Sequence, residues 1–202
     1  MLESAFTLWG TPVTWLEVLA FVLALLNVVC NAMEVHWGWP LTMLASALYV
    51  WLFYASGLYG EAGVNIFFAL TALWGWWQWL RGHRRPRDPA PLAVARLPRT
   101  VWPRWLLAQA LLWLLCSVVL LRWTDSTVPW ADGFVTAGSV LGTVLLGRKY
   151  LENWLVWLIV NAASVVLFAY KGLTLTVLLY VIFFALAWWG WRSWLPRAVS
   201  AS

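Results

Sequence analysis

Two stretches of the chain, 115 positions apart, nearly repeat one another, and both consist almost wholly of apolar residues. Residues 72–80 read ALWGWWQWL and residues 187–195 read AWWGWRSWL. Over 67–80 against 182–195, seven of fourteen positions are identical, and the offset continues upstream without a gap. Duplicated bundles of apolar helices are common in transporters, which hold their substrate between the halves.

The chain has too few polar residues to cover itself with a surface that suits water. Of its 202 residues, 63% are hydrophobic and 10% are charged, whereas a soluble domain carries about 45–50% apolar and about 25% charged residues. Lipid is therefore its solvent, and helices satisfy a membrane-embedded backbone most economically. We predict an all-α integral membrane protein. Its charge of +5 does not indicate a nucleic-acid partner, because most basic residues lie in one loop beside apolar segments.

Seven apolar stretches have roughly the length of a membrane span, which is ~20 residues. They cover about 15–33, 39–57, 62–80, 104–121, 131–147, 153–170 and 173–193. The repeat groups them into a three-helix unit at 15–80, a connecting helix at 104–121 and a second three-helix unit at 131–195. Because the connecting helix restores the chain direction, we expect seven transmembrane helices in a 3+1+3 arrangement with two parallel repeats.

The segments between and beside these units set the orientation. Residues 81–103 hold six arginines and five prolines, which predicts a mobile basic loop. With this loop in the cytoplasm, eleven Lys and Arg residues lie on that side and two on the other, as the positive-inside rule requires. Residues 1–14 then form an extracytoplasmic segment without the basic region of a signal peptide, and 196–202 form a cytoplasmic tail.

Polar groups inside a span are costly, so each is a candidate for function. Trp154, Trp157 and Asn161 stand at i, i+3 and i+7 and share one helix face. Two indole rings beside an amide suit a flat, partly cationic ligand with hydroxyl groups, and the cation–π attraction is worth about 1–2 kcal/mol once water is excluded. The alternative is a pair of interfacial tryptophans, with Asn161 bonded to a neighbouring helix.

Other polar residues in the spans are weaker candidates. They include Asn65, Tyr180 and Gln78, of which Gln78 suits a position in the cytoplasmic interface equally well. A second polar stripe, with Asn27, Asn31 and Glu34 at i, i+4 and i+7, occurs only in the first unit. It suits the lining of a cytoplasmic exit and a hydrogen-bonded seam between helices equally well.

Several chemistries are disfavoured. Both histidines, His36 and His83, fall at predicted membrane edges, so neither a metalloprotease nor a serine protease is expected in the membrane. We expect Cys30 and Cys116 to be buried small hydrophobes. No phosphate-binding glycine loop occurs and no carboxylate is predicted at mid-bilayer, which favours downhill movement of a solute. We expect no enzyme activity, no metal and no cofactor.

Together, Trp39-Pro40 and the runs 48–60, 75–79, 153–161 and 171–180 resemble the Pnu vitamin transporters, and most closely the PnuC-type nicotinamide riboside transporters. The resemblance covers nearly all of 15–195. It implies the 3+1+3 fold, a homotrimer in the lipid of the bacterial inner membrane, and facilitated diffusion of the vitamin into the cytoplasm. It also implies that a cytoplasmic kinase traps the substrate by phosphorylation.

The resemblance also implies which residues bind the substrate. The tandem tryptophan motif of the family falls on Trp154 and Trp157, and the amide after it falls on Asn161. The weaker matches are Asn65, Gln78, Asn153 and Tyr180. Nicotinamide riboside offers a pyridinium ring to the indoles and a ribose to the amides, and it has no phosphate that would need a basic cluster at depth.

The choice of vitamin stays open at this point. Relatives in the family carry thiamine or riboflavin, and thiamine is also a flat cation with a hydroxyl group. Two further alternatives are a membrane scaffold whose tryptophans only anchor it, and a sugar carrier of a similar 3+1+3 arrangement.

Overall fold

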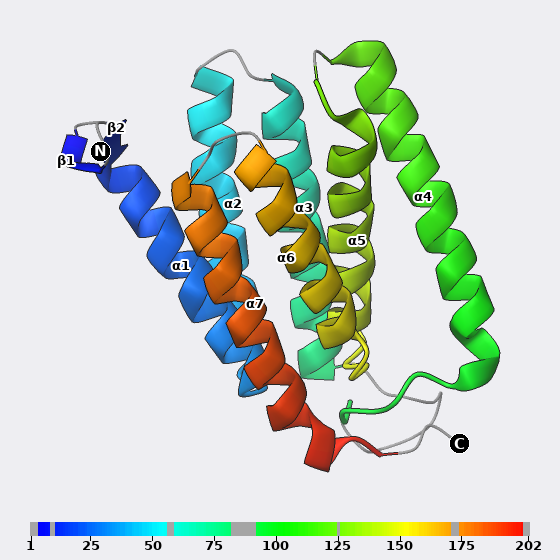
Figure 1. The fold of residues 1–202 in the computed structure, drawn as a ribbon. Helices are drawn as coiled ribbons and strands as arrows, with labels where there is room; N and C mark the ends of the chain where they lie inside the picture. The colour runs from blue at the N-terminus through cyan, green and yellow to red at the C-terminus, as the bar shows by residue number, and fades with distance from the viewer. Residues whose placement is uncertain are drawn as a thin grey trace. The chain divides into compact units, whose positions relative to one another are not determined.

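The computed structural model describes residues 4–8, 11–55, 59–81, 92–124, 126–170 and 174–199. These residues form seven α-helices (Figure 1): α1 Trp15–Ala32, α2 Gly38–Ala55, α3 Tyr59–Arg81, α4 Trp102–Trp123, α5 Pro129–Gly147, α6 Asn153–Tyr170 and α7 Thr174–Trp194. Each helix begins and ends within three residues of a predicted stretch. The all-α fold class is therefore confirmed.

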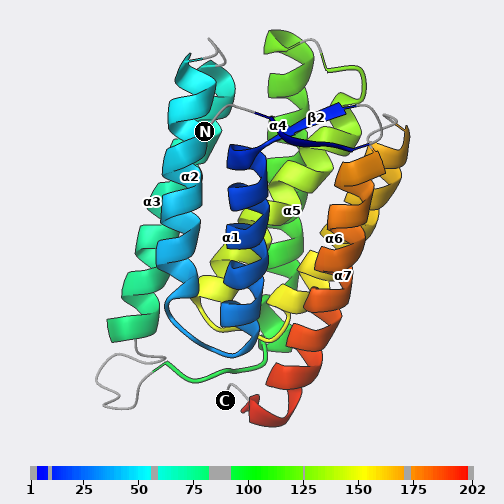
Figure 2. The same ribbon diagram turned by 90° about the vertical axis from the view of Figure 1, so that its left-hand side faces the viewer.

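Short elements lie at the ends of the helices. Strands β1 Ser4–Leu8 and β2 Thr11–Thr14 pair antiparallel and lie at the start of α1 (Figure 2). Two 3-10 turns, η1 Arg99–Val101 and η2 Leu195–Arg197, precede α4 and follow α7. The sequence analysis does not predict the strand pair, which forms within the segment 1–14.

Four stretches among the described residues are long and apolar enough to span a membrane. They are Arg99–Trp123, Pro129–Gly147, Asn153–Tyr170 and Thr176–Arg197, and Phe21–Ala32 is a shorter apolar helix. Their outward side chains are large and apolar; on α4, for example, Leu107 is 60% exposed and Leu111 is 58% exposed. Such a surface requires lipid or another apolar partner around it.

The chain divides into two compact units, Met1–Trp76 and Trp77–Ser202. In the first unit, α1 packs against α2. In the second, α5 packs against both α4 and α6, and α6 packs against α7, as Figures 1 and 2 both show. The last turn of α3 belongs to the second unit, so the boundary falls earlier than the end of the predicted first repeat. The 3+1+3 arrangement stays a prediction.

Small residues on α5 bring its two neighbours close. A Cβ on Gly133 would overlap Ser117 of α4, and a Cβ on Gly138 would overlap Val160 of α6. Both glycines are buried. Small residues of this kind allow helices in lipid to approach closely and gain packing energy.

The duplication is visible in the backbone as well as in the sequence. In the turn after α1, the N–H of Glu34 donates to the carbonyl of Asn31 at 3.2 Å. In the turn after α5, 115 positions on, the N–H of Lys149 donates to the carbonyl of Leu146 at 2.9 Å. Glu34 and Lys149 both have positive φ angles, of 60° and 50°. The two copies therefore build the same turn from different side chains.

A tryptophan against a glycine recurs in each unit. A Cβ built on Gly190 of α7 would lie 2.6 Å from ring atoms of Trp154 on α6, and a Cβ on Gly75 of α3 would likewise overlap the ring of Trp39 on α2. Both tryptophans are 2% exposed. The identical Trp and Gly positions of the repeat are thus explained by close helix packing.

The loop before α4 is more ordered than its composition suggests. Residues 92–98, named here the strap, bury the side chains of Leu92, Val94, Ala95 and Leu97. The N–H of Ala95 donates to the carbonyl of Lys149 at 3.0 Å, and the N–H of Leu151 donates to the carbonyl of Ala95 at 2.9 Å. The predicted mobility is therefore wrong for the strap, because its apolar residues pack on the second unit. Residues 82–91 lie outside the described residues.

Candidate functional site

Buried polar side chains concentrate at α6. Among the described residues, seven polar or charged side chains are buried, and four of them lie in or just before this helix. These four are Glu152, Asn153, Asn161 and Ser164. Burial of a polar group in an apolar setting is costly. Close packing alone therefore does not explain why α6 carries these residues.

The first turn of α6 carries two polar atoms with no hydrogen-bond partner among the described residues. The side-chain amide of Asn153 donates to the carbonyl of Tyr150 at 2.7 Å, but its Oδ1 has no partner. The indole Nε1 of the adjacent Trp154 has none either. Each such buried atom costs about 1–3 kcal/mol. Two unsatisfied polar atoms on consecutive residues mark a point where a ligand or water can bind.

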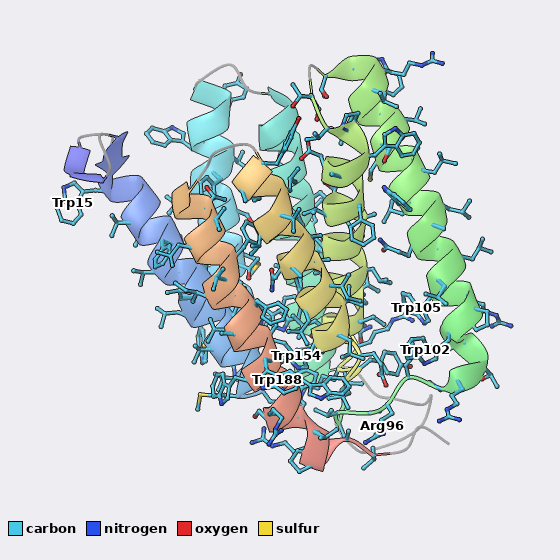
Figure 3. All side chains as sticks on the ribbon, in the orientation of Figure 1. Trp15, Arg96, Trp102, Trp105, Trp154 and Trp188 are labelled. Atoms are coloured by element: carbon cyan, nitrogen blue, oxygen red, sulfur yellow. The ribbon has the colours of Figure 1, made fainter. Side chains whose placement is uncertain are left out.

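The ring of Trp154 is covered in this conformation. It packs against Gly190 and stands edge-on to Trp194, with the ring centroids 5.5 Å apart and the planes at 90°. Trp194 is itself fully buried. Figure 3 shows Trp154 where α6 begins, at the same end of the second unit as Trp188 of α7. The packing alternative therefore accounts for this ring, while its Nε1 remains unsatisfied.

Trp157 occupies a different environment one turn further along α6. Its side chain is only half-buried and lies over α5 at Gly142, where a Cβ would be 3.0 Å from Cε2 of the ring. The repeat pairs Trp157 with Thr42 and Gly142 with Asn27. Only the second unit thus places an indole here, on a flat surface made by a glycine.

We expect Gly142→Ala to weaken ligand binding about three- to ten-fold. The added methyl group would press on the Trp157 indole at 3.0 Å, and overpacking of this kind costs about 1–3 kcal/mol, so the ring must tilt away from α5. Fluorescence titration measures the affinity. Gly133→Ala, which would press on Ser117 of α4 and not on α6, is the control. Equal losses in the two variants would contradict a special role for Gly142.

Asn161 and Tyr180 complete the candidates on α6 and α7. Asn161 is 4% exposed and follows Trp157 by one turn. The Tyr180 ring stacks on Phe168, with centroids 5.2 Å apart and planes at 19°, and is edge-on to Phe183. The structure thus places an amide and a phenol on the two helices that pack together.

The remaining two site candidates, Gln78 and Asn65, lie on α3 and not on α6 or α7. Gln78 is half-buried near the end of α3, in the second unit, whereas Asn65 is half-buried in the first unit. Six of the seven candidates therefore belong to one unit: Trp154, Trp157, Asn161, Asn153, Gln78 and Tyr180. Participation of Asn65 stays a prediction.

Two asparagines of the polar stripe of α1 bond to one another. The amide of Asn31 donates to Oδ1 of Asn27 at 2.9 Å, and a Cβ on Gly38 of α2 would lie 2.7 Å from Oδ1 of Asn31. This bond lies within α1, and Oδ1 of Asn31 has no hydrogen-bond partner among the described residues, so the exit lining and the seam between helices both stay predictions. Cys30, on the same helix, is half-buried and free, as is Cys116 on α4, so neither is as buried as expected.

Sequence reasoning missed a cluster at the end of the second unit where the strap lies. Nε1 of Trp79 donates to the carbonyl of Leu146 at 3.1 Å, and Nζ of Lys149 lies 4.7 Å from the centre of the Trp79 ring. The rings of Trp79 and Trp194 are 6.1 Å apart. These two tryptophans are equivalent in the repeat, which was the available signal.

Comparisons with known proteins agree with one another on the kind of protein. A family model described as nicotinamide mononucleotide transporter matches residues 14–196. The riboflavin/roseoflavin transporter RibM of Streptomyces davaonensis is 27% identical over 97% of this chain and 92% of its own. The nicotinamide riboside transporter PnuC of Escherichia coli is 25% identical over 94% of this chain and 88% of its own.

A solved structure shares the fold. The crystal structure of the vitamin B3 transporter PnuC matches this chain with a TM-score of 0.72 at 23% identity, and the match covers 91% of this chain and 81% of that one. The relatives are thus named for different vitamins.

Proposed function

The chain belongs to the nicotinamide mononucleotide transporter family and is a multi-pass membrane transporter, and on this basis we propose that it carries nicotinamide riboside into the cytoplasm by facilitated diffusion. The observation that carries this choice is the half-buried indole of Trp157 beside the buried amide of Asn161. A pyridinium ring suits the first group, through stacking and cation–π attraction. Ribose hydroxyls suit the second.

The charges on α6 favour a nucleoside over a nucleotide. Residues 153–170 contain no Lys or Arg, and the basic residues that flank α6 in the chain, Arg148 and Lys149 before it and Lys171 after it, lie outside the helix. A phosphate at mid-bilayer would require paired positive charge or many donors. We therefore expect the uncharged ribose end, without phosphate, at the buried amides.

The absence of a carboxylate from the middle of α5, α6 and α7 supports downhill movement. Within α5–α7, the one acidic residue is Asp132, in the first turn of α5. Proton-coupled carriers use ionisable groups inside the membrane. The proposal is therefore uniport. Net uptake continues because a cytoplasmic kinase phosphorylates the imported vitamin.

The basic residues of the second unit support the orientation with the N-terminus outside and the C-terminus in the cytoplasm. The strap bonds to the turn that contains Arg148 and Lys149, and its Arg96 bonds to Val199 near the end of the chain. Figure 3 shows Arg96 at the same end of the unit as Trp102 and Trp105 of α4. By the positive-inside rule this end is cytoplasmic, in a bacterial inner membrane. The homotrimer and the 3+1+3 arrangement are part of the same proposal.

Riboflavin is the second candidate substrate, because RibM aligns with 97% of this chain. Thiamine is the third, since it also offers a flat cation and a hydroxyl. The three-ring flavin of riboflavin needs a wider binding space than the single pyridinium ring of nicotinamide riboside. The two substrates therefore require different amounts of free space beside the Trp157 ring.

Uptake by proteoliposomes of purified protein distinguishes these candidates. We expect saturable entry of labelled nicotinamide riboside down its gradient, at least about ten-fold above empty liposomes and unaffected by a pH gradient. Excess unlabelled thiamine, riboflavin and nicotinamide mononucleotide serve as competitors. Entry of riboflavin or thiamine without entry of nicotinamide riboside would contradict the first choice and support the corresponding alternative.

A further inference from the structure

A buried carboxylate joins the strap to the start of α6. Glu152 is only 9% exposed, and its Oε2 accepts a hydrogen bond of 2.7 Å from the N–H of Leu97. Glu152 immediately precedes Asn153, the first residue of the helix. The bond therefore attaches the strap at the point where the proposed binding face begins.

The strap is bonded to two other segments as well. Ala95 pairs with Tyr150 in the turn before α6 and with Val199 near the end of the chain. The N–H of Arg96 donates to the carbonyl of Val199, and the N–H of Val199 donates to the carbonyl of Val94, both at 3.1 Å. The turn, the strap and the C-terminal segment thus form one hydrogen-bonded group, so the start of α6 cannot move without moving or breaking it.

The internal repeat shows that the turn itself does not require this carboxylate. The equivalent of Glu152 in the first unit is Trp37, which is 59% exposed. The backbone bonds of the two turns correspond one to one: Trp39 N–H to the carbonyl of His36 matches Trp154 N–H to the carbonyl of Leu151, both at 3.2 Å. The turn therefore does not account for Glu152. Its carboxylate accepts a hydrogen bond from the strap, which belongs to the second unit.

The position also suits a negative charge. A carboxylate beside the first turn of a helix interacts favourably with the positive end of the helix dipole. The Leu97 N–H adds a charge-assisted hydrogen bond, which is roughly twice as strong as a neutral one. A buried carboxylate is costly elsewhere, so its placement between these two groups is specific.

We propose that Glu152 is a positioning residue for transport, an inference that rests on the proposed function. Through the strap it holds the first turn of α6, and with it the helix face that carries Trp157 and Asn161, in the geometry that receives substrate. A site arranged in advance binds more tightly because less order is lost on binding. Loss of the carboxylate therefore acts on affinity and leaves the translocation rate nearly unchanged.

The test compares Glu152→Ala, Glu152→Gln and Asp132→Asn with the wild type. Hydrogen–deuterium exchange reports on the strap amides, titration with nicotinamide riboside gives Kd, and proteoliposome uptake gives KM and Vmax. We expect Glu152→Ala to speed exchange in the strap and to raise KM and Kd about ten-fold, with Vmax within two-fold. Glu152→Gln keeps an acceptor oxygen and restores most of both effects.

Asp132→Asn is the matched control, because Asp132 is also a carboxylate at a helix N-terminus and is hydrogen-bonded to Ser126. It should change neither strap exchange nor KM. If Glu152→Ala does not fold, Leu97→Pro removes the donor of the same bond and should raise KM to a similar extent.

The outcomes separate the two proposals. A wild-type chain that binds none of the vitamins overturns the proposed function, and the positioning role with it. Wild-type binding with a freed strap and an unchanged KM in Glu152→Ala overturns the positioning role alone. If the strap amides of Glu152→Ala exchange as slowly as those of the wild type, Glu152 does not hold the strap.

Discussion

Replacement of Trp157 by alanine nearly abolishes uptake of nicotinamide riboside supplied below the wild-type KM, while the protein remains folded and inserted. The half-buried indole is the ring of the stripe that retains an exposed surface, since the Trp154 ring is covered. Loss of stacking and cation–π attraction, about 2 kcal/mol in a desolvated site, weakens binding about thirty-fold. The folded protein tolerates the change because Trp157 is not enclosed in the core. Proteoliposome uptake measures the loss of transport, and fluorescence titration measures the loss of affinity.

Two variants make this result interpretable. Trp157→Phe keeps an aromatic face and should retain part of the uptake. Trp105→Ala removes a half-buried tryptophan of α4 that lies 5.8 Å from the Arg148 guanidinium, and should leave uptake unchanged. Wild-type uptake by Trp157→Ala would remove the α6 stripe from the site.

Gly190→Ala destabilises the second unit and lowers the thermal unfolding midpoint by several degrees. The new methyl group would lie 2.6 Å from atoms of the Trp154 ring, and the ring cannot turn aside because Trp194 stands edge-on to it at 5.5 Å. Overpacking in a close-packed interior costs about 1–3 kcal/mol or more. Thermal unfolding in detergent, followed by near-ultraviolet circular dichroism, measures the loss.

A second substitution tests the assigned cause. Trp154→Phe removes the outer part of the ring, so Gly190→Ala combined with Trp154→Phe should be more stable than Gly190→Ala alone. The repeat supplies a parallel case, because Gly75→Ala would press on Trp39 in the same way. If the double variant is no more stable than Gly190→Ala, the contact with Trp154 is not the reason for the glycine.

The positions of the helices were accessible from composition and spacing. In lipid the backbone must bond within its own segment, so apolar stretches of sufficient length become helices, and α6 spans 153–170 as predicted. The strand pair β1–β2 and the order of the strap were not accessible. Both depend on backbone bonds to distant or adjacent segments, which composition does not encode.

The candidate site was accessible only in part. Periodicity places Trp154 and Trp157 on neighbouring positions of one helix face, but it does not say which neighbour each ring meets. The structure turns Trp154 toward Gly190 of α7 and Trp157 toward Gly142 of α5. The repeat pairs Trp154 with Trp39, but only the structure shows that both rings pack on a glycine.

The sequence by itself determined that this chain is embedded in a membrane, that it is helical and that part of it is duplicated. These properties follow from local composition and period, which act along the chain. Only the tertiary structure decided that one tryptophan of the stripe is enclosed and the other half-open, and that Glu152 binds the strap at Leu97. Such outcomes depend on which side chains meet across helices, and close packing lets a single glycine or N–H decide them.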